Sequence, residues 1–180
     1  MIYIFLADGF EEIEALATVD VIRRAGIDCK TVGVTGKSVT GSHGIKVESD
    51  IGITNIDFNE MSAVVLPGGM PGTINLENNK NVIDAVQYAY NKELLIAAIC
   101  AAPSILGHLG LLMGKKATCY DGFEDELVGA QFIPDGVCVD GNIITACGAG
   151  VAIDFGLEIV AYLTGNREKT ENLSKIMKYR

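Results

Sequence analysis

The chain has 180 residues, with 14 basic and 23 acidic side chains and a net charge of −9 at pH 7. This length predicts a single domain over residues 1–180, which can bury a core without disulfide bonds or a structural metal. The acidic balance and the absence of a lysine or arginine cluster argue against a nucleic-acid binder, which needs a cationic face. The longest apolar run, residues 94–102, is far shorter than the ~20 residues of a membrane span.

The five cysteines, at positions 29, 100, 119, 138 and 147, contain no CxxC pair. An odd number without such spacing favours a reducing compartment over a disulfide-bonded secreted protein. The first residues form a strand-like apolar run with no basic flank and no small-residue cleavage site. We therefore expect a cytoplasmic protein without a signal peptide.

Short apolar segments alternate along the chain with longer amphipathic ones. In chain order we expect a strand at 2–7, a helix at 11–25, a strand at 29–34, a hairpin-like excursion at 39–47, a strand at 63–66, a helix at 81–90, a strand at 94–99, a helix at 103–112, a short strand at 117–120, a hairpin joining 137–139 to 143–145, and helices at 152–163 and 168–178. Fully apolar strands alternating with helices predict an α/β sandwich, a mostly parallel sheet with helices on both faces. Ligands of such sheets bind outside the carboxyl ends of the strands.

Cys100 lies at one of these strand ends, between an apolar strand and a helix that Pro103 opens. Small neighbours such as Ala101 and Ala102 suit a tight strand-to-helix turn that projects one nucleophilic side chain. A helix N-terminus close to the sulfur favours a thiolate, so we expect a pKa below the free value of ~8.5. The alternative is an inert cysteine that continues the buried run.

Three carboxylates, Glu11, Glu12 and Glu14, open the first expected helix. Acidic residues in a first turn ordinarily serve the helix dipole and face solvent, and we read Glu11 and Glu12 in that way. Glu14 falls beside the apolar stripe of the helix, so its carboxyl is expected near the strand ends. Burial would raise its pKa and let the neutral acid donate a hydrogen bond to a thiolate.

Backbone amides offer a second set of groups near Cys100. Gly68 and Gly69 follow the strand at 63–66, and with Ala101 they could form an oxyanion hole, although glycine pairs also occur in simple turns.

The two histidines are less informative. We read His108 as a packed helical residue and His43 as an exposed residue of the excursion. Neither has metal-ligand spacing, and a dinucleotide fingerprint and a phosphate-binding lysine motif are both absent. We therefore expect no metal and no nucleotide cofactor.

Five segments together resemble the ThiJ/PfpI superfamily, and within it the DJ-one branch. They are DGFEEIE at 8–14, VDVIRRAG at 19–26, VVLPGG at 64–69, IAAICAAP at 96–103 and AIDFGLEIV at 152–160. The resemblance implies a flavodoxin-like sandwich, a homodimer and no cofactor. It also implies that Cys100 is the nucleophile, that Glu14 shares a proton with its sulfur, and that Gly69 and Ala101 supply the oxyanion donors.

The resemblance leaves several functions open. Family members are described as glyoxalases or deglycases acting on 2-oxoaldehydes or their protein adducts, and as redox-sensing or chaperone-like stress proteins. A peptidase and a role in thiamine thiazole biosynthesis rank lower. Tyr120 stands where well-known branch members place a histidine, and Ala101 where protease relatives do, so a Cys–His hydrolase is disfavoured. We expect the partner to be a small carbonyl compound or a modified protein.

Overall fold

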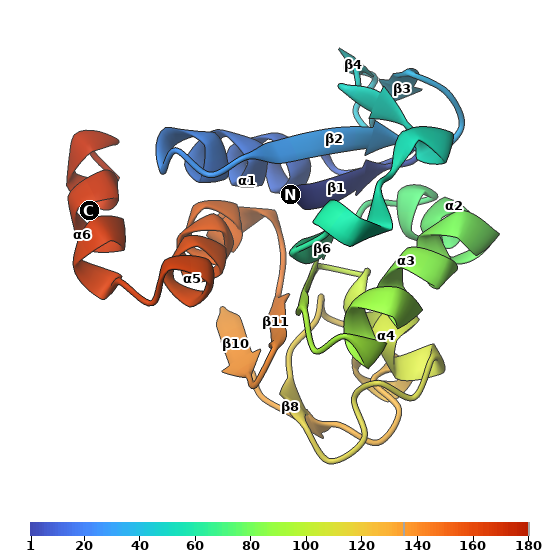
Figure 1. The fold of residues 1–180 in the computed structure, drawn as a ribbon. Coiled ribbons are helices and arrows are strands. Elements are labelled where there is room, and N and C mark those ends of the chain that lie inside the picture. Colours follow the sequence, from blue (N-terminus) through green and yellow to red (C-terminus); the bar gives the residue numbers. More distant parts are fainter. Residues whose placement is uncertain (135, 180) are drawn as a thin grey trace.

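We describe the fold from a computed structural model, which places residues 1–134 and 136–179. Its centre is a seven-stranded sheet in the order β10-β11-β7-β6-β1-β2-β5 (Figure 1). Only the pairing of β10 with β11 is antiparallel. The strands are β1 (Ile2–Leu6), β2 (Cys29–Gly33), β5 (Ile51–Gly52), β6 (Ala63–Leu66), β7 (Leu95–Ile99), β10 (Val137–Asp140) and β11 (Ile143–Ala146).

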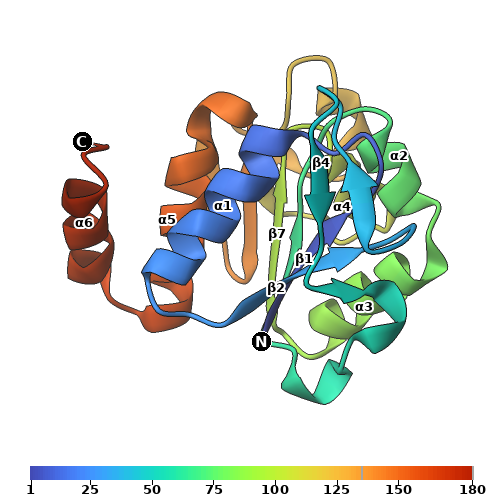
Figure 2. The ribbon, with the colours of Figure 1, turned by 90° about the horizontal axis from the view of Figure 1, so that it is seen from above.

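Helices cover both faces of this sheet, as the fully apolar strands predict. One face carries α1 (Glu12–Arg24) and α5 (Ala152–Thr164), and α6 (Arg167–Ile176) packs outside α5 (Figure 2). The other face carries α2 (Gly72–Glu77), α3 (Lys80–Asn91) and α4 (Pro103–His108). The predicted mostly parallel α/β sandwich is confirmed.

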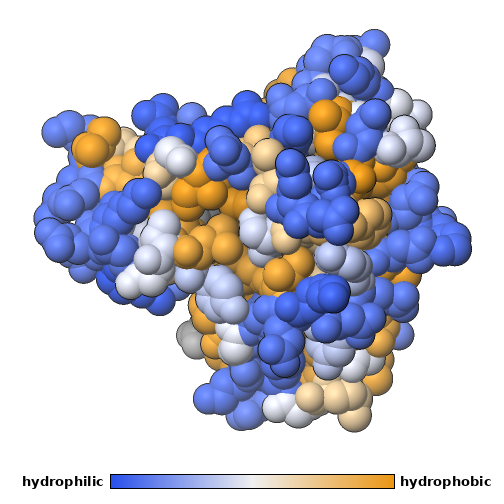
Figure 3. Space-filling model, viewed as in Figure 1, coloured by the Kyte–Doolittle hydropathy of each residue, from blue (hydrophilic) through white to orange (hydrophobic). Residues whose placement is uncertain are grey.

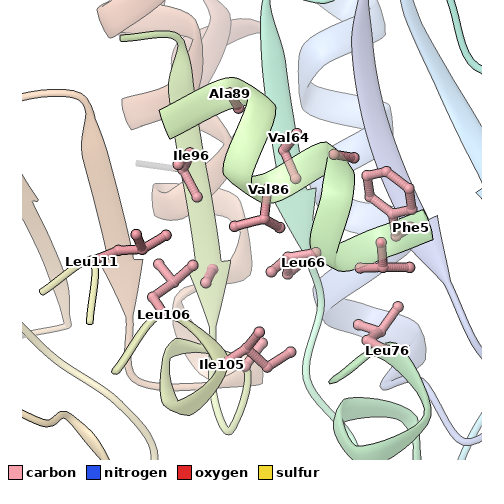
Figure 4. Close-up of a cluster of buried hydrophobic side chains, with 14 of the residues drawn as sticks. Phe5, Val64, Leu66, Leu76, Val86, Ala89, Ile96, Ile105, Leu106 and Leu111 are labelled. Atoms are coloured by element: carbon pink, nitrogen blue, oxygen red, sulfur yellow. The ribbon is translucent and has the colours of Figure 1, made fainter. Parts of the chain in front are cut away.

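Each central strand buries both of its faces. Ile96 and Ala98 of β7 join the core beneath α3 and α4, where Val86, Ile105 and Leu106 meet them (Figure 4). Leu95, Ala97 and Ile99 point the other way, toward α1 and α5. This two-sided burial is why the strand contains no polar residue. On the surface in Figure 3, apolar residues gather through the middle of the view and hydrophilic residues surround them.

Two short sheets lie outside the main one. β3 (Ser38–Thr40) and β4 (Lys46–Glu48) pair antiparallel and confirm the predicted excursion. β8 (Lys116–Ala117) pairs instead with β9 (Gln131–Phe132). Short 3₁₀ turns stand at Ile53–Asn55, Phe58–Glu60, Glu124–Glu126 and Ala149–Val151.

Two predicted elements are shorter than expected. The helix at 103–112 ends at His108, because Gly110 adopts a left-handed φ of 72° and Leu111 N–H bonds back to Leu106 O at 3.0 Å. The strand at 117–120 stops at Ala117. Beyond it, Thr118 N–H donates to the Thr145 hydroxyl at 2.9 Å, so a side chain holds the segment in place of a strand ladder. The helix α2 and the strand β5 were not predicted.

Candidate active site

Cys100 occupies the turn between β7 and α4 in a strained backbone conformation. Its φ is 65°, which residues other than glycine rarely adopt. Backbone hydrogen bonds fix the turn on both sides: Cys100 N–H donates to Ala146 O at 2.8 Å, and Cys100 O accepts from Tyr120 N–H at 2.8 Å. The surrounding strands therefore hold the sulfur in one place at the carboxyl edge of the sheet.

Glu14 reaches that sulfur from the first turn of α1. Glu11 caps the helix by accepting the Glu14 N–H at 2.7 Å, which leaves the Glu14 side chain directed into the protein. The side chain is 1% exposed, and its Oε2 accepts the Gly68 N–H at 2.9 Å. The carboxyl is also hydrogen-bonded to Cys100, and burial raises the pKa of Glu14 to about 7. At neutral pH this carboxyl can therefore both hold and release a proton.

The expected low pKa of Cys100 is wrong. Burial, followed by the negative charge of Glu14, raises the pKa of the thiol to about 12. The amides of Ala101 and Gly69 lower it by donating to the sulfur, but they do not outweigh burial. The helix α4 has only six residues, so its dipole is short. The resting group next to an ionised Glu14 is thus a thiol, and proton transfer must accompany its reaction.

The two glycines after β6 have different roles. A Cβ at Gly68 would lie 2.6 Å from the Cβ of Cys100 and 2.8 Å from Glu14 Oε2, so only glycine fits between them. Gly69 has a φ of 90° and presents its amide to the sulfur. Gly69 and Ala101 therefore lie where the oxyanion donors were expected. The amide of Gly68 does not serve as such a donor, because Glu14 engages it.

The sulfur opens onto a cavity of about 480 Å³. Tyr120 forms part of its wall, and its side chain is 52% exposed. The position where the resemblance places a histidine, a possible third site position beside Cys100 and Glu14, thus lines the cavity. The complete lining is Glu11, Glu14, Ser42, His43, Gly69, Met70, Cys100, Ala101, Tyr120, Phe123 and Ala149.

Sequence reasoning missed that His43 belongs to this wall. Its imidazole is exposed, as expected, but Nδ1 lies 2.9 Å from Oε2 of Glu12. Glu12 is only 4% exposed, so its assignment to solvent is wrong. Burial alone would raise the pKa of Glu12, but hydrogen bonds from His43 and from the backbone lower it. The one sequence signal for this contact was the segment Gly41-Ser-His-Gly44, because its glycines allow the loop to fold closely against Glu12.

The other histidine lies elsewhere. His108 is exposed at the end of α4, so the reading of it as a packed residue is wrong; it bridges Glu77 at 2.6 Å and Glu126 at 2.7 Å and does not line the cavity.

Glu11, Glu12 and His43 are the one group of metal-ligand type within the described ranges. Glu12 already accepts the backbone N–H groups of His43 and Ile45 together with the imidazole, and Glu11 caps α1. These oxygens are engaged by the protein, and we assign no metal to them.

Comparison with known proteins places this chain in a family. The model of the "DJ-1/PfpI family" matches residues 1–162. The chain belongs to the DJ-1/PfpI family. It is 38% identical over 176 residues to Protein DJ-1 homolog A of Arabidopsis thaliana, covering 96% of this chain but only 45% of that relative. Compared with such plant relatives, the chain spans about half of their length.

Other relatives match over nearly their whole length. A Caenorhabditis elegans protein named Glutathione-independent glyoxalase DJR-1.2 is 30% identical over 167 residues, covering 92% of this chain and 88% of that protein. The crystal structure of Drosophila melanogaster DJ-1beta superposes with a TM-score of 0.94 at 34% identity, covering 99% of this chain and 97% of that one. Within the described ranges, no helix has the length and apolar character needed to cross a membrane.

Proposed function

We propose that this DJ-1/PfpI protein converts 2-oxoaldehydes such as methylglyoxal into 2-hydroxy acids, without a cofactor, through Cys100. The supporting observation is the set of groups around one sulfur: the Glu14 carboxyl and the amides of Gly69 and Ala101, at the wall of a cavity. The relative named as a glutathione-independent glyoxalase supports the same reaction class.

In the first step the Cys100 sulfur bonds to the aldehyde carbon C1. The C1=O double bond becomes a single bond, and its oxygen accepts hydrogen bonds from the Gly69 and Ala101 amides. Because the thiol has a high pKa, its proton leaves as the bond forms and passes through Glu14 to that oxygen. The product is a hemithioacetal, and Glu14 returns to its carboxylate form.

In the second step Glu14 moves a proton from C1 to C2. The carboxylate removes the C1 hydrogen, the electron pair forms the C1=C2 bond, and the C2 carbonyl becomes an enediolate oxygen. The same carboxyl then protonates C2, while C1=O forms and the C1 hydroxyl proton passes to the C2 oxygen. A Cys100 thioester of the 2-hydroxy acid results. Water then hydrolyses this thioester, releases the acid and restores the thiol, so methylglyoxal and water together give lactic acid. A pKa of about 7 lets Glu14 carry out both transfers near neutral pH.

The first test is lactate formation from methylglyoxal without glutathione. We expect C100A to abolish lactate formation and E14Q to lower kcat at least about a hundredfold, because a positioned acid–base group contributes that much or more. C119A is the matched control, because Cys119 is 2% exposed, follows β8, and lies outside the cavity lining. Lactate formation by C100A at the wild-type rate would exclude the proposal. Parallel assays on glycated peptides would extend the reaction to deglycation.

A second candidate is redox sensing through oxidation of Cys100 to a sulfinate. The same amides and a protonated Glu14 would donate hydrogen bonds to sulfinate oxygens, which favours that product. Peptide mass spectrometry after dilute peroxide treatment tests it. Modification of Cys29 or Cys138 ahead of Cys100 would contradict the redox role.

We further propose a homodimer. Ile13 on α1 is 57% exposed, and Ile45, whose N–H bonds to the neighbouring Glu12, is 53% exposed. An apolar pair of this kind next to the cavity suits contact with a second copy. Sedimentation equilibrium of the wild type and of I45D tests this. A monomeric wild type would exclude the dimer.

A further inference from the structure

His43 is held at the cavity wall by a buried carboxylate. The carboxyl of Glu12 accepts four hydrogen bonds from the segment around His43: from the Ser42 hydroxyl at 3.3 Å, the His43 N–H at 2.8 Å, the Ile45 N–H at 3.3 Å and the His43 Nδ1–H at 2.9 Å. Gly41 has no space for a Cβ against the Glu12 side chain, so the loop wraps closely. The ring is thus fixed from one side although 71% of it is exposed.

The second ring nitrogen, Nε2, belongs to a side chain that lines the cavity. The bond between Glu12 and Nδ1 sets the tautomer, because a carboxylate accepts a proton-bearing nitrogen. In the part of the chain that the structure describes, Nε2 has no hydrogen-bond partner. Of the side chains that line the cavity, His43 alone can carry a positive charge.

We propose that His43 is a catalytic acid–base residue of the Cys100 site, that it acts on the second carbonyl oxygen of a 2-oxoaldehyde, and that Glu12 is its positioning residue. The inference rests on the proposed function and adds a proton donor for the C2 oxygen, which the mechanism above does not include. Glu14 accounts for the carbon-bound proton, whereas nothing else in the cavity wall is a cationic donor for the oxygen at C2.

The proton balance closes over two half-steps. As Glu14 takes the C1 hydrogen, the imidazolium donates its Nε2 proton to the C2 oxygen, and the neutral enediol forms. As Glu14 returns its proton to C2, the C1 hydroxyl loses its proton to the neutral imidazole, and the thioester carbonyl forms. Both residues end in their starting states, and no oxidant or reductant is consumed.

The charged groups around His43 favour the imidazolium as the starting state. Glu12 lies at 2.9 Å and Glu11 Oε1 at 3.9 Å from Nδ1, both from α1. Their negative charges, Glu12 first through its hydrogen bond, raise the pKa of His43 above 6.5. Across the cavity the remaining ionisable groups are Glu14, Cys100 and Tyr120.

Two substitutions test the roles of the two His43 ring nitrogens separately. H43N places an amide where Nδ1 stands and keeps the link to Glu12, but it removes Nε2. H43Q places a neutral amide near Nε2 that can donate a hydrogen bond but no proton. H108N is the matched control, because His108 is also paired with carboxylates but lies away from the cavity.

The experiment measures kcat and kcat/KM for methylglyoxal against pH, together with the alkylation rate of Cys100. We expect H43N and H43Q each to lower kcat at least about a hundredfold while alkylation changes less than twofold and H108N matches the wild type. The wild-type kcat/KM should rise with Glu14 ionisation and fall as His43 loses its proton. The falling limb should vanish in H43N and move to lower pH in E12Q.

The outcomes are distinguishable. A wild type that forms no lactate overturns both the proposed function and the role of His43. A wild type that forms lactate, with H43N equally active and its falling limb intact, overturns only the role of His43. An equal loss in H43N and in Cys100 alkylation would assign His43 to the structure of the site instead, and would also overturn the proposal.

Discussion

Cys100 and Cys119 have the same raised pKa, about 12, in two different environments. Burial is the first cause at both positions, and negative carboxylates are the next. Cys100, however, also accepts hydrogen bonds from two backbone amides, donates its thiol hydrogen to the Glu14 carboxylate, and opens onto the cavity. Cys119 has none of these contacts among its causes and is 2% exposed. The two thiols thus differ in the groups that can receive a proton or stabilise a negative charge, and not in their resting pKa.

The largest expected effect comes from a substitution that disrupts the packing around Cys100. G68A places a Cβ 2.6 Å from that of Cys100 and 2.9 Å from Ile99 O, and β7 cannot move away. We expect a loss of about 3 kcal/mol in the free energy of unfolding, the upper end for overpacking, together with loss of Cys100 alkylation. Urea unfolding measures the first. G136A, beside Cys119, meets only Val151 at 3.1 Å and should cost less than half as much.

The second prediction concerns the pH dependence of stability. The pKa of Glu14 rises from 4.5 in the unfolded chain to about 7 in the fold, so the folded state binds the extra proton between these values. The stabilising protonated form is complete below pH 4.5 and is lost as the pH rises toward 7. The free energy of unfolding of the wild type relative to E14Q should therefore fall by about 3 kcal/mol over this window. Urea unfolding of both proteins at several pH values between 4.5 and 7 measures this difference, and a constant difference would contradict the prediction.

The third prediction concerns the effect of the Glu14 carboxylate on the reactivity of Cys100. Glu14 raises the pKa of Cys100 by charge and hydrogen bonding, so E14Q should increase the rate of Cys100 alkylation about tenfold at pH 8, a change of ~1 pKa unit. Peptide mass spectrometry with iodoacetamide measures both cysteines in one sample. A slower Cys100 in E14Q would mean that the carboxyl accelerates the thiol by accepting its proton.

The smallest expected effect is at His108, the last residue of α4. His108 joins Glu77 of α2 to Glu126 of the 3₁₀ turn, and these carboxylates raise its pKa above 6.5. The stabilisation is complete below pH 6.5 and is lost as the pH rises through the higher folded value. Because all three groups are partly exposed, H108N should cost only about 0.5–1 kcal/mol at pH 6. Thermal unfolding at pH 6 and pH 9 checks it, and an equal cost at both would contradict the ion pairs.

Local sequence patterns account for most of the fold and for the placement of Cys100. Cys100 is placed at a strand end by the apolar run before it and by Pro103, which opens the next helix. Glu14 is directed inward because it lies beside the apolar stripe of its helix. The pKa of Cys100 was mispredicted because it depends on burial by distant segments. The pairing of Glu12 with His43 joins residues 31 positions apart through a loop wrap that no local periodicity encodes. The hydrogen bond from the Gly68 amide to Glu14 also joins residues far apart in the sequence, so local patterns did not reveal it.

The left-handed backbone of Cys100 has a consequence for selection experiments. Glycine accepts a φ of 65° without steric cost, whereas cysteine does not. Random mutagenesis screened only for thermal survival should therefore enrich C100G over C100A, by about 1 kcal/mol of relieved strain. If the thiol were not needed, selection for stability alone would replace Cys100 with glycine before other residues. Cysteine at this position thus carries a backbone strain that glycine would not.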